Sequence, residues 1–283
     1  MPRGVVPRQP AKTGRQEGRR QVRPTKTVGK RGNVGAGFHP APARKSPAGK
    51  NKAAKADRYN PIAPSRVADI LQRLDQLYPE ATCALHHANA WELLVATILS
   101  AQSTDVNVNR VTPELFRKYP TVEDFARLTP EQLQPDIYST GFFRNKAKSV
   151  VGAAQKLVNQ FGGQVPDDID KLLTLPGVAR KTANVVLGTW FNKAEGVVVD
   201  THVTRISRRL ELTRQTEPQK IEQDLMKVIP REKWIIFAHQ IIWHGRKLCM
   251  ARSPKCVDCP LETLCHAADK TWSTVEIHKA AKP

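Results

Sequence analysis

The sequence predicts an all-α fold. Apolar residues recur at helical spacing through most of the chain after residue 64, and capping residues, Pro and Gly separate the apolar segments. The one strand-like run, VVV at residues 197–199, is too short to found a sheet. These observations predict roughly ten short helices and no sheet.

The first half of the chain contains four helix signals. RVADILQRLDQLYP (66–79) places its apolar side chains on one face, which is typical of an amphipathic helix. WELLVATILSAQ (91–102) is apolar nearly all round, as expected of a helix buried on every side. Thr121 and Thr129 are each followed, three residues later, by an acidic or amide side chain that completes a capping box. Each threonine therefore begins a further short helix.

The second half continues the helical pattern. Residues 143–161 keep their apolar side chains in helical register until a Gly-Gly pair stops the helix. IEQDLMKVI (221–229) and KWIIFAHQIIWHG (233–245) predict two more helices. We expect the second of these to end at Gly245, because glycine commonly follows the last helical residue.

The net charge of +19 is concentrated at the N-terminus. Residues 1–58 contain 16 Lys and Arg against Glu17 and Asp57, so this segment carries +14 and leaves +5 for the rest. It is rich in Pro, Gly and Ala and lacks helical periodicity, which predicts a disordered basic arm. A basic arm on a mildly basic body favours nucleic acid as the partner, although a solubilising tail or an organelle-targeting peptide would carry similar charge. No apolar run approaches the roughly 18 residues of a membrane span, so no membrane partner is expected.

Four of the five cysteines stand close together, as Cys249-x6-Cys256-x2-Cys259-x5-Cys265. Four thiols within 17 residues of an intracellular chain favour a metal over disulfides. Structural zinc sites usually pair two short C-x2–4-C units, whereas this spacing has one such unit between longer gaps. The spacing therefore favours a [4Fe–4S] cluster over zinc, with disulfides third.

Two cations, Arg252 and Lys255, lie between the first two of these cysteines. A loop held rigid by a metal group would present them at its surface, where they could bind DNA phosphates. They could equally offset the negative charge of the thiolates. The residues alone leave both interpretations open.

The stretch LPGVARKTA (175–183) places a tight Pro-Gly turn between two apolar segments, which predicts a helix-hairpin-helix. The turn leaves the backbone N–H groups of Gly177, Ala179 and their neighbours free at a helix start. Such groups can hold a DNA phosphate without reading a base, and Arg180 adds positive charge. Helix N-termini favour acids, so the basic pair at this helix start needs a functional reason.

Lys181 and Asp200 are the candidate catalytic residues. A lysine amine must lose its proton before it can act as a nucleophile, and both partial burial and the positive helix end favour that loss. Asp200 follows the VVV run and precedes a helix that begins near Thr201, so it fits an N-cap. It also fits a carboxylate that accepts a proton from the amine and stabilises positive charge at a sugar carbon. The two roles can coexist.

The assembled motifs resemble the endonuclease III family of DNA glycosylases, from about residue 64 to residue 268. The landmarks are ILSAQSTDVNVN, STGFFRNKA, LPGVARKTANVVL, VVVDTH and the four-cysteine loop with the family's spacing. The resemblance implies a bifunctional enzyme that removes oxidised pyrimidines from damaged double-stranded DNA and cleaves the abasic site. Lys181 would form a Schiff base that leads to β-elimination, with a [4Fe–4S] cluster as cofactor. We expect a monomer in the bacterial cytoplasm at the nucleoid, or in a eukaryotic nucleus or mitochondrion.

The same resemblance implies two lobes that flank a DNA-binding groove. A six-helix barrel containing the hairpin would span residues 84–194. The cluster-containing lobe would combine residues 59–83 with residues 195–270, and residues 271–283 would form a tail. The damaged nucleotide would be flipped out of the stack into the groove, between the catalytic lysine and aspartate.

Gln102 in LSAQ and Phe142 in TGFF match positions where family members push side chains into the gap left by the flipped base. Phe142 would stack on the orphaned base, unless it belongs to the core. The chain departs from the family at Ala179, where the hairpin usually has a second glycine, and we expect weaker phosphate binding there. The stretch GTWFNKAEG between the two catalytic residues is also slightly longer than in the family.

Two other functions compete with this one. A mismatch glycosylase of the adenine-removing type shares the hairpin, the aspartate and the cluster. That relative lacks the lysine and carries an extra C-terminal domain, whereas here only 18 residues follow Cys265. A non-catalytic DNA-binding protein could use the hairpin and the basic arm alone. Lys181 favours the bifunctional enzyme over both.

Overall fold

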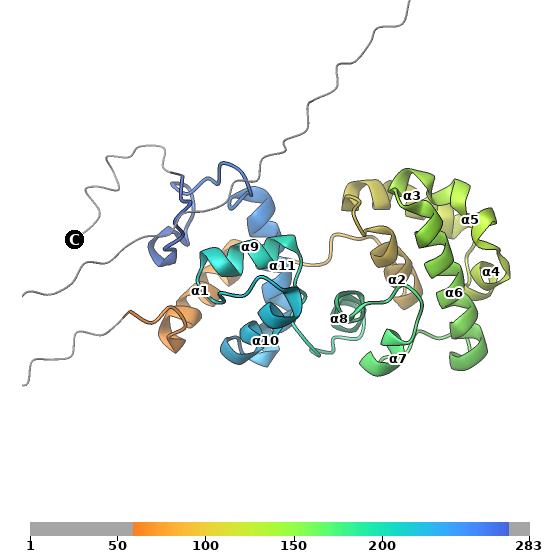
Figure 1. The fold of residues 1–283 in the computed structure, drawn as a ribbon, viewed down its shortest axis with the longest axis horizontal. Coiled ribbons are helices and arrows are strands. Elements are labelled where there is room, and N and C mark those ends of the chain that lie inside the picture. The colour runs from red at the N-terminus through yellow and green to blue at the C-terminus, as the bar shows by residue number, and fades with distance from the viewer. Residues whose placement is uncertain (1–58, 272–283) are drawn as a thin grey trace, which may run out of the picture. The chain divides into compact units, whose positions relative to one another are not determined.

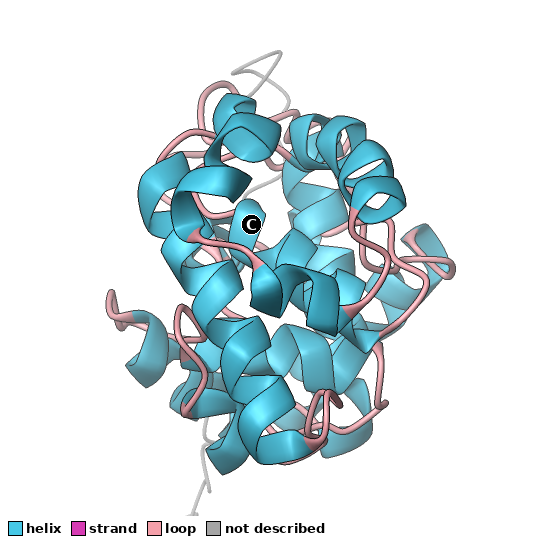
Figure 2. Cartoon of the chain, turned by 90° about the vertical axis from the view of Figure 1, so that its right-hand side faces the viewer, coloured by secondary structure: helices cyan, strands magenta, loops and turns pink. Residues whose placement is uncertain are grey.

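The computed structural model describes residues 59–271. Within this range the chain forms eleven α-helices and three 3-10 helices and no strand (Figure 2), so the all-α prediction is confirmed. None of these helices is long and apolar enough to cross a membrane. The predicted arm at residues 1–58 lies outside the described residues, as does the predicted tail apart from Thr271.

A first hydrophobic core is built by consecutive helices in the first part of the described chain. They are α2 (Ala90–Leu99), α3 (Asp105–Lys118), α4 (Val122–Arg127), α5 (Pro130–Ile137), α6 (Phe143–Phe161), α7 (Ile169–Leu173) and α8 (Arg180–Thr189). Phe125 and Leu94 are fully buried in this core, and α4 and α5 both pack against α6 (Figure 1). The capping boxes predicted at Thr121 and Thr129 are present and begin α4 and α5.

A second core joins a segment before the first core to a segment after it. Its helices are α1 (Pro64–Leu77), α9 (Thr201–Arg209), α10 (Pro218–Val228) and α11 (Trp234–Lys247). Helix α11 packs against both α1 and α9 (Figure 1), and Ile70 and Phe237 are fully buried between these elements. The two separate cores support the division into two lobes at residues 84 and 195, which remains a proposal.

Two predicted helix ends are wrong. Helix α11 continues past Gly245 to Lys247, and an added Cβ at Gly245 would lie 2.4 Å from Nδ1 of His202 on α9. The glycine therefore permits close packing of α11 on α9 and does not end the helix. Helix α2 ends at Leu99 and not at residue 102, because the chain turns there and Gln102 has a φ of 53°.

Candidate active site

The predicted helix-hairpin-helix is formed by α7, a tight turn and α8. Gly177 in the turn has a φ of +76°, and an added Cβ would lie 2.4 Å from Cβ of Ser149, so only glycine fits. Ala179 precedes α8 with an extended backbone, at a φ of −88° and a ψ of 168°. Alanine is therefore unstrained at this position. Because Ala179 has no capping side chain, the N–H groups that begin α8 receive no side-chain cap.

Lys181 lies in the first turn of α8, and its side chain is exposed. No other residue between 59 and 271 forms a hydrogen bond or an ion pair with its amine. The partial burial expected for this amine is therefore wrong for the free protein. Lys181 and Asp200 line the same cavity, which has a volume of about 110 Å³. The fold thus brings the two candidate catalytic residues together.

Asp200 directly precedes α9, as the sequence predicts. Its Oδ1 accepts a hydrogen bond from the backbone N–H of Val203 at 2.8 Å, so the N-cap role is confirmed. Its Oδ2 accepts no hydrogen bond from the part of the chain that the structure describes. The cap fixes the carboxylate in place and leaves one oxygen able to accept a proton.

The same cavity contains four further ionisable groups, from Cys83, Asp105, His239 and Arg246. Asp105 forms an ion pair with Arg246 of α11, and Thr104 caps α3, the helix that Asp105 begins. Burial raises the pKa of the Cys83 thiol and lowers the pKa of the His239 imidazole. Sequence analysis missed His239, because no local motif marks a cavity residue on a buried helix.

Arg180 forms an ion pair with Glu222 of α10, and its Nε donates to Oε1 and Oε2 at 3.1 and 3.0 Å. Glu222 is only 6% exposed and also accepts a hydrogen bond from Nδ2 of Asn184 at 2.9 Å. This carboxylate explains why a cation can stand at a helix N-terminus, because it pairs with the charge. Sequence analysis missed it, since nothing local marks a partner 42 residues away. Contact of Arg180 with DNA stays a prediction.

Gln102 and Phe142 lie in exposed turns with left-handed backbone angles, at φ values of 53° and 48°. Such angles are strained for residues with a side chain, and they often occur at functional sites. Phe142 is 63% exposed, which excludes the core role that the sequence left open. Contact of either side chain with DNA stays a prediction.

Cys249, Cys256, Cys259 and Cys265 all line one cavity in the loop after α11. Among residues 59–271, no three His, Cys, Asp or Glu side chains are placed to hold a metal ion. Four thiols around one cavity supply the donor set that an iron-sulfur cluster needs. Burial, with added repulsion from the other thiols, raises the pKa of Cys259 to about 12.

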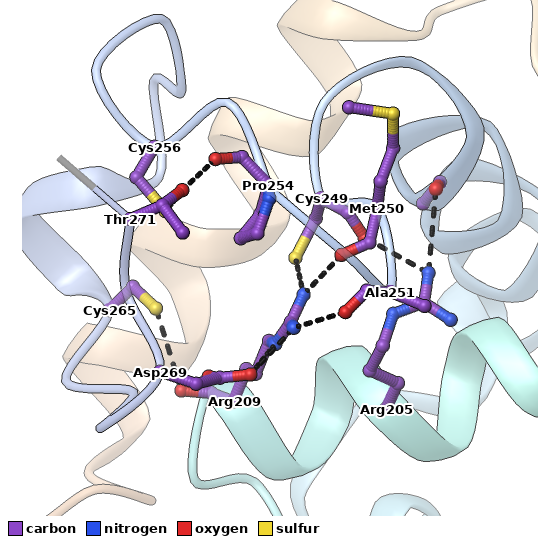
Figure 3. Close-up of polar contacts among 11 residues, drawn as sticks. Arg205, Arg209, Cys249, Met250, Ala251, Pro254, Cys256, Cys265, Asp269 and Thr271 are labelled. Carbon is purple, nitrogen blue, oxygen red and sulfur yellow. Dashed lines mark hydrogen bonds and ion pairs between the residues drawn. The ribbon is translucent and has the colours of Figure 1, made fainter. Parts of the chain in front are cut away.

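Two arginines of α9 hold this loop by its backbone (Figure 3). Arg209 donates to the carbonyl oxygen of Met250 at 2.7 Å and to Sγ of Cys249 at 3.2 Å. Arg205 donates to the carbonyl oxygen of Cys249 at 2.9 Å. Sequence analysis missed both arginines, because their partners lie about forty residues further along the chain.

Arg252 and Lys255 are both exposed. Neither side chain forms a hydrogen bond or an ion pair with another described residue. Within residues 59–271 neither cation therefore forms a hydrogen bond to a thiol, although Lys255 lines the cavity of the cysteines and charge compensation is compatible with this arrangement. Phosphate binding by these two cations stays a prediction.

The all-helical fold, the hairpin and the lysine-aspartate cavity define a class of protein. Residues 95–231 match the HhH-GPD superfamily of base excision DNA repair proteins. Endonuclease III of Synechocystis is 54% identical over 203 residues, which cover 72% of this chain and 93% of the relative. Endonuclease III of Bacillus subtilis is 45% identical over 201 residues, which cover 71% of this chain and 91% of the relative.

A solved structure gives the same result. It is a trapped covalent intermediate of an endonuclease III with DNA, and it matches with a TM-score of 0.69 and 43% sequence identity. The match covers 72% of this chain and 96% of that one. This chain therefore belongs to the endonuclease III family, and it is a DNA glycosylase and abasic-site lyase.

Proposed function

We propose that this enzyme removes oxidised pyrimidines from double-stranded DNA and then cleaves the abasic site, with Lys181 as the nucleophile. One observation carries the proposal: the exposed amine of Lys181 and the half-buried carboxylate of Asp200 line the same cavity. The covalent intermediate captured with DNA in the solved relative supports an enzyme nucleophile. The bacterial relatives favour the bacterial cytoplasm as the compartment.

Base removal would begin when the damaged nucleotide leaves the stack and enters the cavity. The neutral amine of Lys181 attacks C1′ of the deoxyribose. The bond from C1′ to the base breaks, and its electron pair leaves with the base, which takes up a proton. DNA that excludes water would disfavour the ammonium-carboxylate pair, so a lysine proton passes to Oδ2 of Asp200. The neutral acid then gives this proton to the departing base, and the carboxylate that results stabilises positive charge at the sugar.

Strand cleavage would follow from the adduct. Opening of the sugar ring gives a Schiff base between Nζ of Lys181 and C1′, and its cationic nitrogen draws electrons from the sugar. Transfer of a proton from C2′ to water then expels the 3′ phosphate by β-elimination. Hydrolysis of the Schiff base by water releases the lysine. Every step uses groups supplied by the enzyme, the DNA or water.

The proposed DNA contacts surround this cavity. Hairpin N–H groups would bind a phosphate, because α8 begins without a side-chain cap. Strained, exposed turn residues would fill the gap left by the flipped nucleotide, and exposed cations of the cysteine loop would bind further phosphates. The full set is Gln102, Phe142, Gly177, Ala179, Arg180, Arg252 and Lys255.

Cys249, Cys256, Cys259 and Cys265 would hold a [4Fe–4S] cluster. Four thiols around one cavity support this assignment, and the spacing of the cysteines in the sequence favours the cluster over zinc. When bound, the cluster would supply four iron-sulfur bonds that cross-link the loop. The visible absorption spectrum and iron content of the freshly purified protein test it. A colourless protein with stoichiometric zinc would overturn it.

Borohydride trapping on duplex DNA with one oxidised pyrimidine, with base release measured on the same duplex, tests the nucleophile. We expect the wild-type protein to form a covalent adduct and Lys181→Gln to form none. Asp200→Asn should trap much more slowly while binding DNA nearly as well, because asparagine keeps the N-cap but cannot accept the proton. Equal losses of binding and rate would contradict the role of Asp200.

The competing functions give different results in the same experiment. Base removal without any trappable adduct in the wild-type protein would indicate the adenine-removing type. Binding to damaged duplex without base release or adduct would indicate a non-catalytic DNA-binding protein. Both outcomes would reject the proposed lysine chemistry.

A further inference from the structure

Lys146 is a buried lysine that the proposed chemistry does not use. It lies in the first turn of α6 and is 4% exposed. Its Nζ donates to the carbonyl oxygens of Leu99 and Thr140, each at 2.8 Å. No carboxylate in residues 59–271 pairs with it, and burial lowers the pKa of its amine. A buried cation without a counter-ion is costly, so neutral carbonyls alone must stabilise it.

The two carbonyls belong to the ends of two separate helices. Leu99 is the last residue of α2, and Thr140 is the last residue of the 3-10 helix Tyr138–Thr140. Carbonyl groups at helix C-termini carry partial negative charge and favour a cation. The same ammonium therefore binds two chain segments that are distant in sequence.

Each of these helix ends leads directly into one of the two strained turns. Gln102 follows the end of α2 by three residues, and Phe142 follows the end of the 3-10 helix by two. A second contact ties the same turns, because Nδ2 of Asn107 donates to the carbonyl oxygen of Ser139 at 2.9 Å and to Oγ of Ser103 at 3.1 Å. Lys146 thus connects the two helix ends from which these turns begin.

We propose that Lys146 is a positioning residue that fixes the spacing between the Gln102 turn and the Phe142 turn, so that both side chains enter the duplex together. The inference rests on the proposed function and extends it to base extrusion. Lys146 touches neither DNA nor the reacting atoms. Its effect passes through the two turns, which need a fixed geometry because partly inserted side chains would not hold the nucleotide outside the stack.

Lys146→Met tests this role, with Lys148→Met as a matched control. Methionine is one atom shorter than lysine and unbranched, so it fills most of the same space while it removes both hydrogen bonds. Lys148 is an exposed lysine on the same helix. Borohydride trapping is measured on a duplex with one abasic site and on the single strand with the same site. Only the duplex needs nucleotide extrusion. We expect Lys146→Met to slow duplex trapping by up to about 100-fold and to leave single-strand trapping unchanged.

Equal slowing on both substrates, or a duplex rate equal to that of Lys148→Met, would overturn the proposal. Partial unfolding would lower the final yield of adduct on both substrates, which separates it from a slower rate. If wild-type protein forms no adduct with either substrate, the proposed function fails by itself. Amide hydrogen exchange then decides: faster exchange at residues 100–104 and 139–143 in Lys146→Met than in Lys148→Met supports the connection through Lys146, and equal exchange rejects it.

Discussion

The first hydrophobic core and the cysteine loop (residues 248–271) are held by different forces. Phe125 and Leu94 are completely buried among apolar neighbours in the first core. Leu261 of the cysteine loop packs into the second core. The loop is also held by arginine side chains, which donate hydrogen bonds to several of its backbone carbonyls. Arg209 holds Met250 in this way, and Nη1 of Arg73 donates to the carbonyl oxygen of Pro260 at 2.7 Å.

This difference means that the force that folds the first core is not the force that attaches the cysteine loop. Burial of apolar surface is non-directional, so it stabilises the first core throughout its helices. Hydrogen bonds from arginine are directional and act at single points of the loop, as bonds from the proposed cluster would. The loop should therefore detach without unfolding the first core, whereas loss of apolar packing should unfold the first core as a unit.

Removal of one cluster ligand should have the largest effect. We expect Cys259→Ala to lose the visible absorption of the purified protein completely, because three thiolates leave one iron of the cube without its ligand. Amide hydrogen exchange should become fast across residues 248–271 and stay slow in α6, if the loop detaches alone. Equally fast exchange in α6 would show that the two regions unfold together. Cys83→Ala is the control, because Cys83 lies in another cavity.

A cavity in the first core should have the next largest effect. The Phe125 ring is fully buried and meets the rings of Trp91 and Tyr119 with centroids 5.3 and 5.4 Å away. Phe125→Ala should lower the free energy of unfolding by about 3–5 kcal/mol in urea titrations. Leu173→Ala is the control, because Leu173 is 39% exposed. A loss no larger than that of the control would contradict burial as the main force here.

Loss of the arginine contacts should have a smaller, local effect. Arg209→Lys keeps the charge, but the lysine amine lacks the planar guanidinium that donates to both the carbonyl oxygen of Met250 and Sγ of Cys249. An unsatisfied buried carbonyl costs about 1–3 kcal/mol, so opening of residues 248–271 should become easier by that amount in hydrogen exchange. Arg208→Lys, an exposed neighbour on α9, should change nothing. Weakening of α6 as well would contradict the separation of the two regions.

The sequence predicts local features of both regions because their signals are local. The two capping boxes and the helix-hairpin-helix each follow from a few neighbouring residues, and the structure contains them. The N-cap role of Asp200 is equally local, and its hydrogen bond to Val203 confirms it. The spacing of the four cysteines likewise predicts their shared cavity.

The remaining features depend on contacts between distant segments. Glu222 pairs with Arg180, and Lys146 binds the ends of two helices, but no periodicity or motif marks either contact. Gly245 shows the same limit, because a glycine that usually ends a helix here admits a neighbouring helix. The exposure of Lys181 also could not be predicted, since it depends on the whole surface around the hairpin.

The buried cation of the first core should give the smallest effect, visible only as pH changes. Burial lowers the pKa of Lys146 below its ordinary value of 10.5, so the unfolded chain binds more protons between those two values. The free energy of unfolding of the wild-type protein, relative to Lys146→Met, should therefore rise with pH across that window and stay constant below it. Urea titrations of both proteins from neutral to alkaline pH measure the difference.

The contribution of Arg209 to holding the cysteine loop should show no such dependence, because its guanidinium group stays protonated throughout this range. The free energy of opening of residues 248–271 should therefore differ between wild-type protein and Arg209→Met by the same amount at every pH. The free energy of unfolding should instead differ between wild-type protein and Lys146→Met by an amount that rises with pH. If the difference between wild-type protein and Lys146→Met does not change with pH, burial of the Lys146 ammonium does not lower the free energy of unfolding. The two carbonyls would then compensate its desolvation completely, and the contrast between a costly buried cation and freely charged arginines would disappear.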